Sequence, residues 1–372
     1  MKAVVLAIVF YIFLFSVDGF SIEFRRSVQD IRSLGMGNTG IASANTSGTI
    51  FYNPAALANI TEGWIDIPSV QTIYSDKAKS FYQDIVEEKF LDSTRKLRSL
   101  INKYIGEDIY VQADVGVSFF YNVDSKGFTV GGNWIYERIY DYEINNPTAP
   151  EIDAFERYDT IKQIGLSYPI DRGEIVLGLA AKTVRRSEKT FVFTSDQLIA
   201  EEEFPVPEFP GVDDGETASG TGYAVGLLWR IPSPYRFVFG GVWRSEIDFD
   251  GEVTKIPEEG AVGLTMAHAF GIFRWTFALD LRDISYKQGS ENDKNNNRRI
   301  HAGTELSIFP TSDLNYILSF RAGFNQGYQT TGAELRLGNS LVLGYARYTE
   351  EIGEYVGEKG SQRTALFIST GF

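Results

Sequence analysis

The sequence predicts an all-β protein, a transmembrane antiparallel β-barrel of about fourteen strands. Three observations support this class. Segments in which apolar and polar residues alternate recur from residue 64 to residue 372, their connections alternate between short turns and long loops, and aromatic residues make up 14% of the chain. Bacterial outer-membrane barrels combine all three features, because each strand turns an apolar side to lipid and because aromatic side chains gather at both membrane interfaces.

The chain opens with a segment typical of a signal peptide. Lys2 precedes about thirteen apolar residues, AVVLAIVFYIFLF, a length that suits a signal-peptide core and is short of the roughly twenty residues that a membrane-spanning helix needs. Gly19 and Ser21 offer alternative small residues for cleavage, so residues 1–21 are predicted to be the signal peptide. No cysteine follows the apolar run, which excludes a lipoprotein anchor.

Composition and motifs exclude several classes of function. A net charge of -14 argues against nucleic acid as a partner, because phosphate binding needs a basic face. The string GMGNTG at 35–40 fits the glycine pattern of dinucleotide turns, but its flanks indicate neither a buried strand nor a long helix. Only His268 and His301 are present, with no nucleophile elbow or metal-ligand spacing around them. We therefore expect no enzyme activity, no cofactor and no metal.

The alternating segments carry the fold prediction. In FRWTFALDLR (273–282), Trp275 and Phe277 share one face, while Arg274 and Asp280 share the other. This period of two is that of a β-strand, and the apolar face is expected to meet lipid while the polar face lines the lumen. The predicted strands span 64–74, 110–121, 126–144, 155–169, 173–194, 221–231, 235–249, 260–270, 272–283, 298–309, 314–324, 329–337, 340–349 and 363–372.

The connections orient the barrel. Tight turns such as VDSK and DRG follow the even-numbered strands, whereas long stretches such as 75–109 and 195–220 follow most odd-numbered strands. Outer-membrane barrels have short periplasmic turns and long external loops, so both termini are predicted to be periplasmic. Helical spacing of apolar residues in 75–105 predicts one or two external helices.

The N-terminal motifs indicate a family. RSLGMGNTG (32–40) followed by FYNPAAL (51–57) resembles the start of the FadL/TodX family of outer-membrane transporters for hydrophobic compounds, and of its FadL-like sister group of uncertain role. The resemblance implies a fourteen-stranded barrel with an N-terminal hatch inside the lumen. The domains are then 1–21 signal peptide, 22–62 hatch or plug, and 63–372 transmembrane β-barrel. The implied hatch residues are Gly35, Gly37, Gly40, Asn53, Pro54 and Ala55.

The resemblance also implies a function. It predicts a monomeric channel in the outer membrane of a Gram-negative type of cell, surrounded by outer-membrane lipid, for passive uptake of small hydrophobic ligands such as long-chain fatty acids. The alternative is a FadL-like barrel that acts as a scaffold or shuttle for secreted or surface proteins without transport. An apolar pocket under the external helices, with an arginine that reaches a carboxylate, would favour transport. A lumen filled by hatch and loops, with a flat external surface for binding protein, would favour the scaffold.

The predicted third strand contains candidates for a lateral opening. Members of the family pass ligand sideways through a gap made by a kink in this strand, which here contains Gly131 and Gly132. Paired glycines weaken a strand and permit a bulge. The alternative is that the two small residues leave room for contact with the hatch.

Charged side chains are predicted to face the lumen. One interpretation is a salt-bridged network that joins wall and hatch, and the other is that arginines bind a ligand carboxylate, for which guanidinium is a bidentate partner. The candidates for carboxylate binding are Arg244, Arg274 and Arg321. The full inward-facing set is Asp114, Arg230, Arg236, Arg244, Arg274, Asp280, Arg282, Arg299, Glu305, Arg321, Glu334 and Arg336.

The last predicted strand, RTALFISTGF, ends on Phe372. A terminal Phe on an alternating strand resembles the signal that the barrel-assembly machinery recognises, so this machinery is an expected partner.

Overall fold

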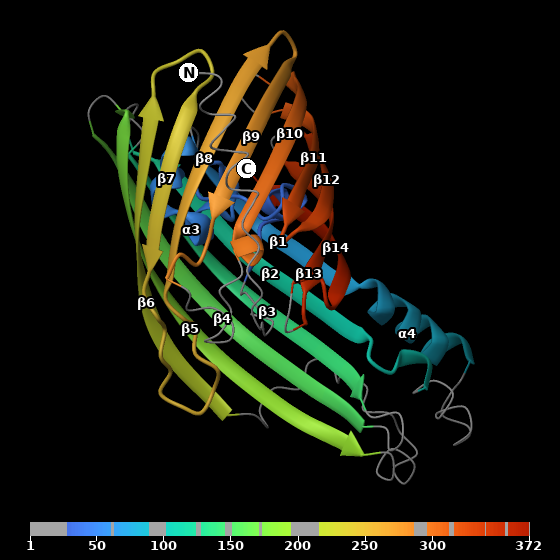
Figure 1. Cartoon of the computed structure of the whole chain (residues 1–372). Helices are drawn as coiled ribbons and strands as arrows, with labels where there is room; N and C mark the ends of the chain where they lie inside the picture. Colours follow the sequence, from blue (N-terminus) through green and yellow to red (C-terminus); the bar gives the residue numbers. More distant parts are fainter. Residues whose placement is uncertain are drawn as a thin grey trace.

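The computed structural model describes residues 28–60, 63–88, 102–123, 128–145, 151–170, 173–194, 216–285, 296–311, 316–338, 340–353 and 356–371. Fourteen antiparallel strands form one closed barrel in which sequence neighbours pair and β1 pairs with β14 (Figure 1). The strands are β1 (Trp64–Ser75), β2 (Asp108–Asn122), β3 (Thr129–Asn145), β4 (Glu151–Ile170), β5 (Ile175–Thr194), β6 (Glu216–Ile231), β7 (Phe237–Arg244), β8 (Glu259–Phe270), β9 (Phe273–Leu281), β10 (Ile300–Pro310), β11 (Tyr316–Asn325), β12 (Tyr328–Leu337), β13 (Leu341–Glu351) and β14 (Gly360–Gly371). The fold class predicted from alternation is confirmed.

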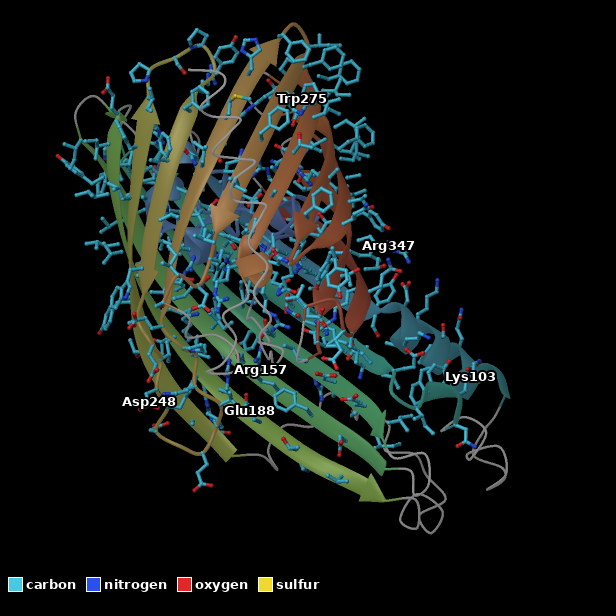
Figure 2. All side chains as sticks on the ribbon, viewed as in Figure 1. Lys103, Arg157, Glu188, Asp248, Trp275 and Arg347 are labelled. Atoms are coloured by element: carbon cyan, nitrogen blue, oxygen red, sulfur yellow. The ribbon has the colours of Figure 1, made fainter. Side chains whose placement is uncertain are left out.

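The two faces of the strands are those that the alternation predicts. Trp275 and Phe320 point outward and are 44% and 48% exposed, whereas Asp280 and Arg321 point inward and are 1% and 5% exposed. Trp275 lies on the outside of β9 close to the end of the barrel that carries the tight turns (Figure 2). The barrel is thus apolar outside and polar inside, as lipid contact requires. No helix within the described ranges is long and apolar enough to cross a membrane.

The strands are unequal in length. β4 and β5 have 20 residues each, whereas β7 has 8. The longest strands extend beyond the short ones at the end that carries the long loops (Figure 1). β7 was predicted to reach residue 249, but it ends at Arg244, because the chain then turns inward and Ile247 pairs with Ile256 inside the barrel.

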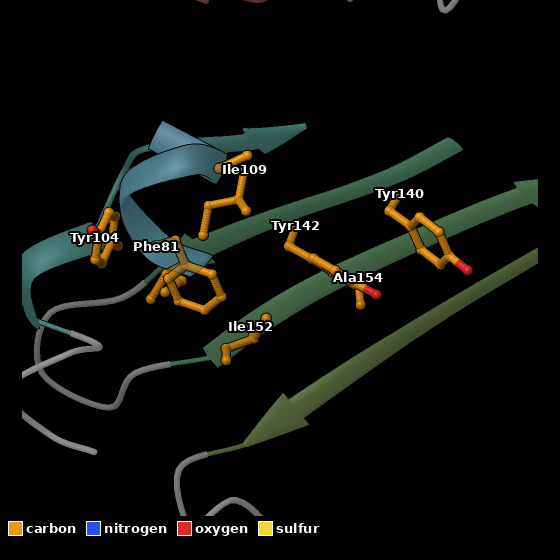
Figure 3. Close-up of a cluster of buried hydrophobic side chains, with 9 residues drawn as sticks. Phe81, Tyr104, Ile109, Tyr140, Tyr142, Ile152 and Ala154 are labelled. Atoms are coloured by element: carbon orange, nitrogen blue, oxygen red, sulfur yellow. The ribbon is translucent and has the colours of Figure 1, made fainter. Parts of the chain in front are cut away.

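A helix packs beside the extended strands. α4 (Asp76–Glu88) lies within the predicted helical stretch, and a helical turn at 102–104 follows it; residues 89–101 are outside the described part. Phe81 of α4 meets Tyr104 edge-on, with ring centroids 5.2 Å apart. The cluster that they join is shown in Figure 3 and comprises Ala78, Phe81, Tyr104, Ile109, Tyr140, Tyr142, Ile144, Ile152 and Ala154.

Residues 28–60, the N-terminal segment, lie inside the barrel (Figure 1). The segment contains α2 (Ile31–Gly35), α3 (Thr49–Tyr52) and the 3-10 helix η1 (Pro54–Asn59). Asp30 caps α2 by accepting from Ser33 N–H, and Asn53 caps η1 by accepting from Ala55 N–H. These turns are short, so burial against the wall stabilises them rather than helix propensity. The predicted signal peptide (1–21) and Phe372 lie outside the described residues.

The wall has one irregularity among the described strand pairs. β1 shifts register between Asp66 and Ser69 against both of its neighbours, β14 and β2. β3, in contrast, pairs without a break through Gly131 and Gly132, with β2 on one side and β4 on the other.

Candidate functional site

A cavity of about 800 Å³ occupies the tight-turn end of the lumen. We call it the turn-side cavity. The N-terminal segment forms its floor with Ala42, Ala58 and Ile60, and the ends of the strands form its walls with residues such as Val238 and Val342. A volume of this size is typical of ligand sites, which run from about 300 to 1,000 Å³.

Two smaller cavities lie around the N-terminal segment. The loop-side cavity, about 90 Å³, is lined by Lys182, Arg244 and Ile247, and the wall cavity, about 40 Å³, lies between the segment and strands β1–β3. Val28, Gln29 and Phe51 line both of these cavities. Asp30, Ile31, Ser47 and Phe367 line both the wall cavity and the turn-side cavity. The three cavities therefore follow one another past the segment, and the wall cavity beside β1–β3 lies between the other two.

Wall side chains fix the N-terminal segment by hydrogen bonds to its backbone. The Asp280 carboxylate accepts from the N–H groups of Gly40 and Ile41, at 2.6 and 2.9 Å. Asn133 donates to the Ser47 carbonyl at 3.0 Å, from the opposite side of the barrel. Such bonds satisfy the polar groups of irregular backbone that would otherwise be buried without partners.

Ion pairs between the segment and the wall form a chain of alternating charge. Arg32 pairs with Glu305, Glu305 with Arg321, and Arg321 with Glu334, at 2.7 to 2.8 Å. Arg336 completes the chain by donating to Glu334 at 2.8 Å. These side chains are buried apart from Arg336, and each charge has an opposite neighbour.

A second network surrounds the loop-side cavity. Glu259 accepts from Arg244 at 2.7 Å and from Arg282 at 3.0 Å, and Arg244 also donates to the Tyr52 carbonyl. Arg244 and Arg321, both candidates for carboxylate binding, are thus engaged with wall acids. The contacts fit the interpretation of a network that joins wall and hatch.

Arg274 is placed differently. It lines the turn-side cavity, and within the described part of the chain it has no hydrogen bond or ion pair; its Nε is buried and unpartnered. Arg236, at the rim of the same cavity, also has no side-chain partner among the described residues. A ligand carboxylate in this cavity would meet two guanidinium groups that form no ion pair with an acid of the described part of the chain.

The predicted hatch residues lie at contacts with the wall. Gly37 has φ +68°, and a Cβ there would overlap the carbonyl oxygens of Ala302 and Phe324. On β5, a Cβ at Gly178 would overlap the backbone of Pro54 and Ala55. Glycine is therefore required both in the segment and in the wall, because the two backbones touch. Whether any of these residues moves to open the channel stays a prediction.

Gly131 and Gly132 both lie in close contact with neighbouring atoms. A Cβ on Gly131 would lie 2.5 Å from the Phe120 ring and 3.3 Å from Leu57 of the N-terminal segment, and the ladder is continuous at both glycines. The contact corresponds to the alternative in which small residues make room for the hatch.

Comparison with known proteins identifies solved structures that have a similar fold. No family model and no curated protein matches the sequence. Among solved structures, the TodX deltaS2S3 mutant monoaromatic hydrocarbon channel has a TM-score of 0.55 at 11% identity, over 96% of this chain and 99% of that chain. The TodX deltaS2 mutant has a TM-score of 0.51 at 13% identity, over 91% and 97%. The chain has the fold of the TodX channel. The Pseudomonas putida toluene transporter TodX itself aligns over 96% and 99% at 13% identity, with a TM-score of 0.49.

With the TodX fold established, two features stand out that the sequence did not indicate. The first is that Arg244 and Arg321 form ion pairs with wall acids whereas Arg274 forms none with a described acid, a difference that depends on which side chains the folded wall brings together. The second is the break in β1, whose only sequence signal is Pro68, a residue without an N–H to donate to a ladder. Of the two histidines, Nδ1 of His301 lies 3.0 Å from the Gly37 carbonyl oxygen, and Nδ1 of His268 lies 3.2 Å from the Pro234 carbonyl oxygen.

Proposed function

We propose that this chain is an outer-membrane channel that admits small hydrophobic molecules by passive diffusion. The observation that carries the proposal is the turn-side cavity of about 800 Å³ inside a barrel with the TodX fold. A barrel that served only as a scaffold for secreted proteins would need no such cavity. TodX mutants of the same fold are described as monoaromatic hydrocarbon channels, which supports a hydrophobic ligand here.

The arrangement of the cavities explains how a ligand would pass. The N-terminal segment blocks a straight aqueous pore, so water and ions meet a barrier of buried backbone and paired charges. An apolar molecule would move from the loop-side cavity past Phe51 and Phe367 into the turn-side cavity. Transfer out of water into such a lined passage is favourable by about 25 cal/mol per Å² of apolar surface, and no energy source is required.

The unpaired cation points to the finer ligand class. We infer that hydrophobic carboxylates, such as long-chain fatty acids, bind in the turn-side cavity with their carboxylate at Arg274. A charge-assisted hydrogen bond contributes about 1.5–3 kcal/mol, which is enough to favour an acid over a neutral hydrocarbon of similar size.

The proposed orientation follows the loop lengths. The tight turns and both termini would face the periplasm, so the turn-side cavity would be the exit side and α4 would lie outside the cell. Insertion as a monomer by the barrel-assembly machinery, with Phe372 as its signal, remains part of the proposal.

Uptake measurements test the function. Gram-negative cells that lack their own channels for hydrophobic compounds would express this chain and receive radiolabelled toluene or oleate. We expect uptake well above that of cells with an empty vector. Val342→Trp, which fills the turn-side cavity, should reduce uptake, whereas Leu343→Trp, on the neighbouring lipid-facing residue (37% exposed), should not. Equal uptake with and without the protein would overturn the proposal.

A further inference from the structure

The one register break among the described strand pairs lies where two of the internal cavities meet the wall. β1 spans three residue steps between Asp66 and Ser69, while β14 and β2 each span two, from Gly371 to Ser369 and from Ser118 to Gly116. β1 therefore carries one extra residue against both neighbours. Ile67 and Pro68 make up the bulge, and Pro68 has no N–H with which to restore a ladder bond.

Side-chain hydrogen bonds replace the missing ladder at this place. Asp66 accepts from Ser369 Oγ at 2.5 Å and from Trp64 Nε1 at 3.1 Å, and Thr370 Oγ1 donates to the Ile67 carbonyl at 2.6 Å. Elsewhere in the described wall, neighbouring strands are joined by unbroken ladders. Asp66–Ser69 of β1 is thus the place in the described wall where the register of the ladder shifts, and side chains supply part of the contact with β14 there.

Space is available on the inner side of the bulge. Asp66, Ser369 and Gly371 line the turn-side cavity, and Ser69 and Gly116 line the wall cavity. Most of these side chains are small, so little bulk separates the cavities from the wall. Phe367, which lines both cavities, is the one large apolar side chain on this stretch of β14 that faces them.

The outer side of the bulge is apolar. Ile67 in the bulge and Ile65 just before it are 49% and 43% exposed, on the surface that would meet acyl chains. A hydrophobic molecule that leaves the turn-side cavity along the barrel axis must enter water, whereas one that leaves through the wall enters lipid. The second route avoids the unfavourable hydration of apolar surface.

We propose that the bulge at Ile67–Pro68, in the seam between β1 and β14, is the lateral exit through which ligand leaves the turn-side cavity for the membrane. This inference rests on the proposed function and refines it by placing the exit at β1, away from Gly131 and Gly132 of β3. Opening requires Ser369 to release Asp66 and the two strands to separate over a few residues.

Reversible cross-links test this placement, because the chain has no cysteine of its own. Ser69 and Ser369 are directly opposed across the seam, and opposed residues of an antiparallel pair have the Cα spacing that a disulfide needs. A disulfide formed by Ser69→Cys and Ser369→Cys would hold β1 and β14 together and close the proposed exit. Ser307→Cys with Ser319→Cys, an opposed serine pair between β10 and β11, is the matched control, and Ser118→Cys with Asn133→Cys pins β2 to β3 beside Gly132.

Oxidation should reduce uptake of labelled toluene and oleate at least about five-fold in the Ser69/Ser369 variant, because the route into lipid is closed. Reductant should restore uptake, and neither other pair should respond. Loss of uptake only in the Ser118/Asn133 variant would move the exit to β3, and no response in any pair would show an axial exit; either result overturns the proposal.

Deletion of Pro68, which restores the register, should reduce uptake in a barrel that still migrates as a folded protein on a gel when the sample is not heated. Absence of uptake by the unmodified protein would reject the channel function itself, and the exit with it.

Discussion

Arg32 of the N-terminal segment and Glu305 of β10 are joined by two hydrogen bonds, 2.9 Å from Nε to Oε2 and 2.8 Å from Nη2 to Oε1. They are 273 positions apart in the sequence, and both are buried. A guanidinium that faces a carboxylate in this way fixes orientation as well as distance. The pair therefore holds the segment at one position and one angle across the lumen.

Glu305→Gln should loosen the N-terminal segment. The change leaves Arg32 and Arg321 buried without their shared carboxylate, and removal of one partner from a buried ion pair costs about 3–5 kcal/mol. We expect a lower melting temperature and faster entry of small sugars in liposome-swelling assays. Lys255→Met is the control, because it removes an exposed ion pair with Glu246 (side chains 59% and 43% exposed). It should lower the free energy of unfolding by no more than about 0.5 kcal/mol and leave the swelling rate unaltered. An unaltered swelling rate in Glu305→Gln would show that the pair does not position the segment.

Gly37→Ala should prevent the segment from seating. The added Cβ meets the carbonyl oxygens of Ala302 and Phe324 in a left-handed backbone conformation, so both sterics and φ oppose it. Gly327→Ala is the matched control, because its φ is +89° with no atom within 4 Å of the added carbon. The control should lose about 1 kcal/mol from φ strain alone, and Gly37→Ala clearly more. Equal melting temperatures of the two folded variants would contradict the close contact.

Arg274→Gln should discriminate between ligand classes. The unpaired guanidinium is expected to bind a carboxylate, so uptake of oleate should fall about ten-fold or more while uptake of toluene stays the same, as loss of a charge-assisted hydrogen bond predicts. Arg336→Gln, in the same cavity, is the comparison, because Arg336 already pairs with Glu334 at 2.8 Å. A parallel fall for both tracers would indicate that Arg274 supports the cavity and does not recognise an acid.

The anchor of α4 should weaken in acid. Lys103 and Tyr104 each donate to Asp84 at 2.6 Å, and these bonds, that of Lys103 first, hold the pKa of the Asp84 carboxyl below its usual value. A depressed pKa means that the stabilisation is present above the ordinary value of about 3.9 and is lost as pH falls through the lower folded value. Hydrogen exchange of the first turns of α4 should therefore rise below about pH 4. Asp84→Asn should show no such rise, and an identical pH profile in both proteins would reject the anchor.

Much of the barrel could be predicted from the sequence, because the period of two is imposed at every strand by lipid on one side and water on the other. The faces of β9 and β11 were assigned correctly from Trp275, Asp280, Phe320 and Arg321 alone. Strand ends were less predictable. At β7 the apolar Ile247 continues the alternating pattern but turns inward, because an internal cluster with Ile135 and Val184 buries it more completely than lipid contact would.

The candidate site could be predicted only in part. The sequence indicates which arginines face the lumen, but it does not show that Glu259 and Glu305 form ion pairs with Arg244 and Arg321 while Arg274 forms none with a described acid. Each of these acids lies opposite its arginine on the adjacent strand, so the pairing depends on the exact strand register, which the alternating pattern alone does not fix. The break in β1 was missed for a similar reason, since one extra residue is visible only against the register of β2 and β14.

The pairing of β1 with β14 has a consequence for biogenesis. These are the two strands farthest apart along the chain, so the cylinder remains an open sheet until the last strand has been delivered. Residues 28–60 contact β9–β13 and would be shut out by early closure. The sheet must therefore curve around these residues before β1 pairs with β14. That closing strand pair is the one that contains the extra residue of β1.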